Sequence, residues 1–195
     1  MTDKFKKAYA ATMQNEGGYA NDPHDRGGET WRGVARNSWG AWPGWKIVDA
    51  IKAQHPVSLN AALAANTELS NMVLDFYKQN FWDPLKLDQL DSNQISLQLF
   101  DISVNMGTGR GSKMLQQAIN HFRAANPIGV DGQIGPITIS AANAIDHQAL
   151  YDQINTLRGN FYNAIIQRDP TQERFRRSWF SRIKPFNAGS DAAVA

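Results

Sequence analysis

The chain has 195 residues, of which 42% are hydrophobic and 19% are charged. This is an ordinary globular composition, long enough for one well-filled core or two small lobes, and it excludes wholesale disorder. The formal net charge of +2 is too small to indicate a nucleic-acid partner by itself. Apolar runs stay well short of the roughly 18 residues that span a bilayer, so we expect no insertion into a membrane.

Cysteine is absent from the chain. We therefore expect a fold without disulfide bonds, and no cysteine is available as a nucleophile. The first seven residues carry charges but are not followed by the apolar segment of a secretory signal. We expect synthesis in the cytoplasm, with delivery by another route if the substrate lies outside the membrane.

Apolar residues recur at helical spacing along most of the chain. We predict helices, in chain order, from Phe5 up to the Gly17-Gly18 pair, at 34–39, at 44–54, from an Asn66 cap through Tyr77, and at 95–106, 110–124, 147–168 and 171–184. Residues 19–33 contain one proline and three glycines and predict an irregular loop or a short hairpin. Pro84 begins a predicted connector over 84–92, and residues 188–195 are typical of a frayed tail. Strand patterns are almost absent, so the sequence predicts an all-α fold.

Several common catalytic constellations are missing from the sequence. The four histidines are far apart and form no metal-ligand spacing. The chain has no G-x-S-x-G motif and no glycine-rich loop before a Lys-Ser/Thr pair. These absences argue against zinc amidases, serine hydrolases and P-loop NTPases, and we expect neither a metal nor a cofactor. Paired carboxylates remain as the candidate catalytic groups.

Glu16 is the glutamate whose position suggests chemistry. Glu68 and Glu173 lie near predicted helix N-termini, where a carboxylate stabilises the helix dipole. Glu16 instead lies in the last turn of the first predicted helix, where the negative end of the dipole favours its protonated form. A carboxylic acid that stays protonated near neutral pH can donate a proton to a glycosidic oxygen. The alternative interpretation is an ordinary surface glutamate near a helix end.

A second carboxylate is expected from the segment that follows Glu16. Asp22 and Asp25 both qualify, and the glycines after Asp25 let the chain fold back toward Glu16. The hydroxyl of Thr30 could contact a water molecule that Asp25 holds. Asp25 can equally be a turn residue beside glycines, and the residues alone leave this open.

Around these carboxylates the chain contains the residues Glu16-Gly17-Gly18-Tyr19, Pro23, Asp25, Gly27-Gly28, Thr30 and Gly33. This pattern resembles the signature of the glycoside hydrolase family 108 muramidases, with Val34 where isoleucine is usual. The order of Glu16, Asp25 and Thr30 is also similar to the catalytic set of phage-type lysozymes. Those enzymes usually have one more residue between the aspartate and the threonine.

Later segments of the chain resemble a second domain of the same family. They are residues 101–107, residues 131–136, Thr138, Trp179 and Arg182. They are similar to the helical peptidoglycan-binding-like domain that follows the catalytic part, so the resemblance covers about residues 5 to 184. It implies a catalytic part over 1–92, a helical peptidoglycan-binding-like part over 93–185 and a flexible tail over 186–195.

The resemblance implies a lysozyme-like fold in which the loop or short hairpin carries part of the active site. The substrate would be the glycan strands of peptidoglycan, cleaved at the β-1,4 bond between N-acetylmuramic acid and N-acetylglucosamine. Glu16 would donate the proton, Asp25 would activate water or stabilise the oxocarbenium-like state, and Thr30 would orient the water. Phage-type lysozymes further suggest inversion at the anomeric carbon. A holin or a secretion system would deliver such a bacteriolytic enzyme to the wall.

Four further residues are candidates for substrate contacts. Tyr19 and Trp31 lie in the predicted loop and could stack on sugar rings, with core packing as the alternative for both. Asp101 and Asn105 are four residues apart on an apolar helix and therefore share a face. They either form a buried hydrogen-bonded pair or line a cleft that hydrogen-bonds N-acetyl groups, and the resemblance favours the cleft.

Two other functions stay open on the sequence alone. A non-catalytic cell-wall-binding module would bind tightly without turnover, and a chitin or chitosan glycosidase would be indifferent to the lactyl-peptide substituent. Separately, the segment 168–184 carries six basic residues against two acidic ones. A basic helix could face an anionic polymer, but we interpret it as a solvated helix face and expect no nucleic-acid partner.

Overall fold

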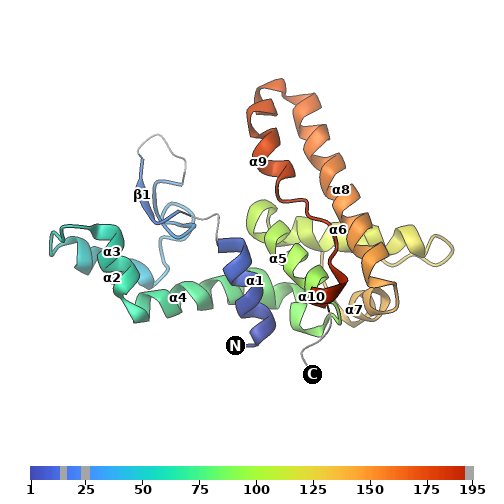
Figure 1. The fold of residues 1–195 in the computed structure, drawn as a ribbon, viewed down its shortest axis with the longest axis horizontal. Coiled ribbons are helices and arrows are strands. Elements are labelled where there is room, and N and C mark those ends of the chain that lie inside the picture. Colours follow the sequence, from blue (N-terminus) through green and yellow to red (C-terminus); the bar gives the residue numbers. More distant parts are fainter. Residues whose placement is uncertain (14–16, 23–26, 192–195) are drawn as a thin grey trace. The chain divides into compact units, whose positions relative to one another are not determined.

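The computed structural model describes residues 1–13, 17–22 and 27–191 (Figure 1). The chain divides into two compact units. Unit 1 comprises Met1–Ala8 and Phe81–Ala195, and unit 2 comprises Tyr9–Asn80. No helix within the described ranges is long and apolar enough to cross a membrane.

Unit 2 contains a small antiparallel sheet. Its strands are β1 (Tyr19–Asn21), β2 (Glu29–Trp31) and β3 (Val34–Ala35), in that order. Arg32 and Gly33 connect β2 to β3 with positive φ angles of 43° and 78°, the combination that matches a two-residue turn to the twist of a hairpin. The short hairpin expected in this region is confirmed. The helix expected at 34–39 is wrong, because Val34 and Ala35 pair with β2 instead.

Three helices complete unit 2 together with the second part of α1 (Asp3–Met13). They are α2 (Gly44–Lys52), α3 (Leu59–Ala65) and α4 (Thr67–Tyr77), and they pack on one another. The cap expected at Asn66 is confirmed, because its Oδ1 accepts a hydrogen bond from the backbone N of Leu69 at 2.8 Å. Helix α3 was not predicted, although Ser58 supplies its N-cap by accepting from the backbone N of Ala61.

Unit 1 is helical throughout its body. Its main helices are α5 (Asn93–Met106), α6 (Thr108–Phe122), α7 (Pro136–Asn143) and α8 (His147–Arg168). They confirm the helices expected at 95–106, 110–124 and 147–168. The rings of Phe5, Trp82 and Phe100 meet edge to face in the core, with centroids 5.3–5.8 Å apart.

The connector expected at 84–92 contains short helical turns rather than open loop. The turns before α5 are η1 (Lys78–Trp82, a π-helix), η2 (Asp83–Leu85) and η3 (Leu87–Gln89). Leu85, Leu87 and Leu90 are all buried, so the connector is part of the core of unit 1.

The long helix expected at 171–184 is wrong. The segment forms a 3-10 turn, η4 (Pro170–Phe175), and a short helix, α9 (Arg176–Phe180), which returns beside α8 (Figure 1). The side chain of Asp169 accepts from the backbone N of Thr171, which caps the tight turn after α8. The uniform basic helix face expected from the sequence therefore does not form.

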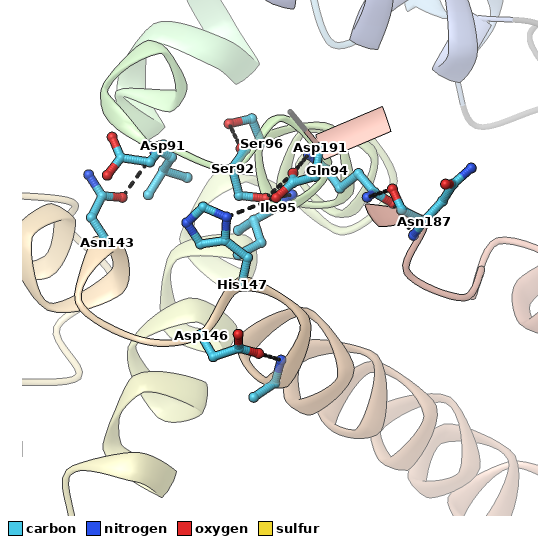
Figure 2. Close-up of polar contacts among 12 residues, drawn as sticks. Asp91, Ser92, Gln94, Ile95, Ser96, Asn143, Asp146, His147, Asn187 and Asp191 are labelled. Atoms are coloured by element: carbon cyan, nitrogen blue, oxygen red, sulfur yellow. Dashed lines mark hydrogen bonds and ion pairs between the residues drawn. The ribbon is translucent and has the colours of Figure 1, made fainter. Parts of the chain in front are cut away.

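The segment assigned to a flexible tail at 186–195 contains a helical turn, α10 (Ala188–Asp191). Figure 2 shows the carboxylate of Asp191 among groups of α5 and α8. It accepts hydrogen bonds from Ser92 Oγ at 2.6 Å and from the backbone N of Gln94 at 3.0 Å, and lies 2.8 Å from Nδ1 of His147. Asp191 is only 8% exposed, so this end of the chain is anchored to unit 1.

Candidate active site

Two of the three predicted catalytic residues, Glu16 and Asp25, lie outside the described residues. The structure describes the segments that flank them. Strand β1 begins three residues after Glu16, and Asn21 at its end pairs with Glu29 at the start of β2. The β1–β2 pairing therefore joins the two ends of the segment that contains Asp25.

The backbone just after Glu16 is fixed on two sides. The backbone N of Tyr19 donates to Oδ1 of Asn60 at 2.7 Å, and the carbonyl of Gly18 accepts from the backbone N of Arg32 at 3.2 Å. A Cβ atom at Gly18 would lie 2.2 Å from that Asn60 oxygen. Only glycine at position 18 therefore allows Asn60 to hold the start of β1, which gives Gly18 of the motif a packing reason.

Thr30, the third predicted catalytic residue, lies in the middle strand of the sheet. Its neighbours across the two strand pairs are the small residues Ala20 and Ala35. The half-buried Thr30 hydroxyl donates to the carbonyl of Gly28 at 3.2 Å. Donation leaves the hydroxyl oxygen able to accept a hydrogen bond from a water molecule.

The sheet also contains a charge cluster that the sequence analysis missed. Glu29 accepts from the Tyr19 hydroxyl at 2.7 Å, from Lys52 Nζ at 2.5 Å and from Arg36 at 2.7 Å. Arg36 also pairs with Asp49 of α2 at 2.7 Å. Burial acts to raise the pKa of Glu29, but hydrogen bonds from Lys52 and Tyr19 and the charges of Arg36 and Lys52 outweigh it and lower that pKa. Glu29 is thus an ionised anchor between the sheet and α2.

The two aromatic candidates of the loop differ in the structure. Trp31 is 1% exposed and belongs to the core, so the expected stacking of this ring on a sugar is corrected. Tyr19 is half-buried, and Lys52 Nζ lies 5.5 Å from its ring centroid. The hydroxyl of Tyr19 is committed to Glu29, so Tyr19 fixes β1 whether or not its ring also meets substrate.

An exposed tryptophan cavity in unit 2 was also missed. Trp39 is 39% exposed and packs edge to face on Phe76 at 4.9 Å. With Trp42, Gln79 and Asn80 these rings line a cavity of about 450 Å³. It combines aromatic surface with amide groups, which is the mixture that ligand pockets commonly present.

In unit 1, Asp101 is held by two guanidinium groups. Its carboxylate accepts from Arg158 at 2.6 Å and from Arg182 at 2.9 Å. Arg158 is 1% exposed and also donates to the Tyr162 hydroxyl at 2.9 Å. Asp101 therefore joins α5 to α8 and to Arg182, and its predicted contact with a sugar stays a prediction.

The partner of Asp101 in the sequence analysis, Asn105, lies at a cavity. Its amide nitrogen donates to the carbonyl of Asp101 at 2.7 Å and to its carboxylate at 3.2 Å. The cavity has about 290 Å³ and is called cavity A; its lining residues are Asn105, Met106, Arg110, Phe161, Tyr162, Ile165 and Trp179. Trp179 stacks on Tyr162 with centroids 5.3 Å apart and an interplanar angle of 18°. Cavity A thus joins an amide to a planar aromatic wall.

No group of three histidine, aspartate or glutamate side chains in the described part of the chain could hold a metal ion. The residues that the structure brings together are carboxylates with their lysine and arginine partners, amides and aromatic rings. Such groups suit a carbohydrate, whose hydroxyl and N-acetyl groups need hydrogen bonds and whose ring faces are apolar.

Comparison with known proteins agrees with this chemistry. The profile of glycosyl hydrolase 108 matches residues 9–107, and that of a predicted peptidoglycan domain matches residues 110–184. The solved structure of SagA from Brucella abortus is similar at 27% identity, with a TM-score of 0.64 over 92% of this chain and 88% of that chain. Comparison with curated proteins gives no match. The predicted family, lysozyme-like fold and polymer are confirmed: the chain belongs to the glycosyl hydrolase 108 family and is a glycoside hydrolase of peptidoglycan.

Proposed function

We propose that this peptidoglycan hydrolase is an N-acetylmuramidase with Glu16 and Asp25 as its catalytic carboxylates. The β1–β2 hairpin carries the proposal. Its first strand starts at Tyr19, three residues after Glu16, the segment with Asp25 joins its two strands, and its second strand holds Thr30. One small element therefore connects all three residues in the chain.

In the proposed reaction Glu16 gives its proton to the glycosidic oxygen as the bond from C1 of N-acetylmuramic acid to that oxygen breaks. Asp25 takes a proton from water, and the water oxygen forms the new bond to C1 from the opposite face. The Thr30 hydroxyl accepts a hydrogen bond from that water. Inversion of this kind requires the two carboxyl groups to lie roughly 6.5–9.5 Å apart, whereas a retaining mechanism requires about 5 Å.

Peptidoglycan lies outside the cytoplasmic membrane, so the proposed function also needs a route to the wall. Release through a holin or a secretion system stays our expectation for a protein made in the cytoplasm. Bacterial lysis on exposure from outside, compared with lysis after expression inside the cell with and without a holin, tests this expectation directly.

The bond and the stereochemistry are tested on purified peptidoglycan. We expect digestion to create new reducing ends that borohydride converts to muramitol, identified by mass spectrometry. Proton NMR early in the reaction should show the α-anomer, since the bond cleaved is β. New glucosaminitol ends would reassign the bond, and a 1,6-anhydro product would contradict attack by water.

Glu16 is tested with a matched glutamate. Glu16→Gln should abolish turnover while the protein still folds and sediments with the wall. Glu68→Gln, at the first turn of α4, is the control and should keep its rate. Normal turnover by Glu16→Gln would remove Glu16 from the mechanism, whereas wall binding without turnover by the unaltered chain would indicate a binding module.

A further inference from the structure

A second cavity of unit 1, called cavity B, lies between α6 and α8 and has about 600 Å³. On α6 it is lined by Arg110, Lys113 and Gln117, whose spacing of three and four residues places them on one face of the helix. All three side chains are exposed. On α8 it is lined by Leu157 and Phe161. The cavity therefore has a polar, cationic side and an apolar side.

The two cations of cavity B have no carboxylate partner among the described residues. The guanidinium of Arg110 lies 4.1 Å from the ring centroid of Phe161, which holds it in place without neutralising it. The stem of Lys113 lies against Gly132, where an added Cβ would be 3.2 Å from Cε. The one carboxylate on the wall, Asp131, accepts instead from Gln116 at 2.7 Å and from the backbone N of Gln133 at 2.8 Å. Arg110 and Lys113 are therefore available to an external anion.

Cavities A and B share Arg110 and Phe161. Cavity A presents the stacked rings of Tyr162 and Trp179 and the amide of Asn105, which suit an uncharged sugar. Cavity B presents two cations. The same small region of unit 1 thus offers an aromatic surface with an amide group directly beside two cations, and Arg110 borders both.

Peptidoglycan likewise has an uncharged part beside an anionic part. Its glycan is uncharged once the lactyl group of N-acetylmuramic acid forms an amide with the stem peptide, and the free carboxylates belong to that peptide. We infer that cavity B binds a carboxylate of the stem peptide through Arg110 and Lys113, while cavity A faces the adjoining sugar. This inference rests on peptidoglycan as the substrate and deepens the proposed function by adding recognition of the peptide.

The test uses two soluble probes, N-acetylglucosaminyl-N-acetylmuramic acid carrying a stem tetrapeptide and the same compound with its peptide carboxylates amidated. The bond inside this disaccharide is not the one that the proposed function cleaves, so calorimetry measures binding alone. We expect the full chain to bind the free-carboxylate probe about tenfold more tightly, the effect of one or two charge-assisted hydrogen bonds. The difference should shrink with added salt.

The variants remove the same interaction from the protein side. Arg110→Gln with Lys113→Gln should bind both probes equally, and Lys113→Gln alone, which keeps the Arg110–Phe161 contact, should lose part of the preference. Arg168→Gln with Arg177→Gln changes the net charge equally at exposed positions of unit 1 and should keep the preference. Equal binding of the two probes by the unaltered chain would overturn the inference. So would retention of the preference in the Arg110 and Lys113 variant, or its loss in the control.

These outcomes are separate from those of the proposed function. A chain that yields muramitol ends but does not distinguish the probes is a muramidase without this peptide site. A chain that distinguishes the probes but yields other ends keeps the peptide site and loses the bond assignment.

Discussion

In each unit the described residues include a carboxylate held by two cations, and these two clusters are built differently. In unit 2, Glu29 is paired with Arg36 and Lys52, whose side chains are 31% and 33% exposed. In unit 1, Asp101 is paired with Arg182 and with Arg158, whose side chain is 1% exposed. Water reaches both cations of the first cluster, whereas in the second cluster loss of Asp101 would leave the buried charge of Arg158 without a carboxylate.

The difference between the two clusters matches the roles proposed for the two units. The hairpin of unit 2 bears the proposed catalytic groups, and solvent-accessible pairs such as Glu29–Lys52 hold it to α2. Unit 1 holds cavities A and B on helices fixed by the buried Arg158. We therefore expect substitutions on the hairpin segment to change turnover, and substitutions in the Asp101 cluster to change stability.

The largest effect is expected in turnover, at Asp25. Asp25→Asn should lower kcat by about two to four orders of magnitude, the contribution of a positioned acid–base group. Thr30→Val should lower it less, because the change removes only a hydrogen bond to the water. All variants should unfold at the same urea concentration as the unaltered chain.

Asp22→Asn is the matched control on the same segment and should cost less than about tenfold in kcat, a loss that a change in loop geometry explains. A severe Asp22 effect with a nearly silent Asp25→Asn would move the water-activating role to Asp22. The role proposed for Glu16 would survive that result.

The next largest effect is expected in the free energy of unfolding, and it tests the contrast between the two carboxylate clusters directly. Arg158→Met should lower the free energy of unfolding by about 3–5 kcal/mol, because Asp101 and the Tyr162 hydroxyl lose a buried partner. Arg36→Met in unit 2 should lower it by about 1 kcal/mol, since the Arg36 side chain is 31% exposed and Glu29 keeps Lys52 and Tyr19 as partners. Urea unfolding followed by circular dichroism measures both, and equal losses would contradict the contrast between the clusters.

A smaller effect concerns pH and Glu29. The pKa of Glu29 in the folded chain lies below the ordinary value of 4.5. The ionised cluster therefore stabilises the folded state fully above about pH 4.5, and this contribution is lost as the pH falls through the folded pKa. Glu29→Gln should cost about 1–2 kcal/mol at pH 7. The difference from the unaltered chain should shrink below pH 4.5. If the difference in unfolding free energy stayed constant from pH 7 to pH 3, the charge of Glu29 would not be the source of the stabilisation.

Local patterns predicted the long elements and missed those fixed by distant contacts. Helix α8 was predicted over its full length because its apolar spacing is regular. Strand β3 has only two residues and depends on pairing with β2, so no periodicity marks it. The segment 171–184 has helical spacing, but the Asp169 cap and the hydrogen bond from Asn155 to the carbonyl of Lys184 give it another path.

The residues of the candidate site likewise separate into those that a local motif predicted and those that only distant contacts reveal. Glu16, Asp25 and Thr30 lie within one short motif and could be proposed from it. Glu29 and Lys52 are far apart in sequence, and no local signal connects them. A signal did exist for Arg158, since it interrupts a series of buried residues spaced by four along α8: Leu150, Ile154, Arg158, Tyr162 and Ile166. A charge at such a position predicts a buried partner.

The smallest effect is expected where Asp191 meets the N-terminus of α5. Its carboxylate accepts from the backbone N of Gln94, one of the donors that a helix start leaves unpaired, and complements the positive end of the helix dipole (Figure 2). Burial acts to raise its pKa, but hydrogen bonds from Gln94, Ser92 and His147 outweigh burial and lower it. This contribution is therefore present above the ordinary value of 3.8 and lost as the pH falls through the folded pKa.

Asp191→Asn keeps one acceptor oxygen but removes the charge, and it should cost about 1 kcal/mol of unfolding free energy at pH 7. Asp152→Asn, an exposed aspartate of α8, is the control and should change little. Because Asp191 contacts α5 and α8 and none of the hairpin, kcat should stay the same in both variants. A loss of kcat in Asp191→Asn without a loss of stability would mean that this end of the chain reaches the reaction. It would also contradict the expectation that the hairpin of unit 2 sets turnover.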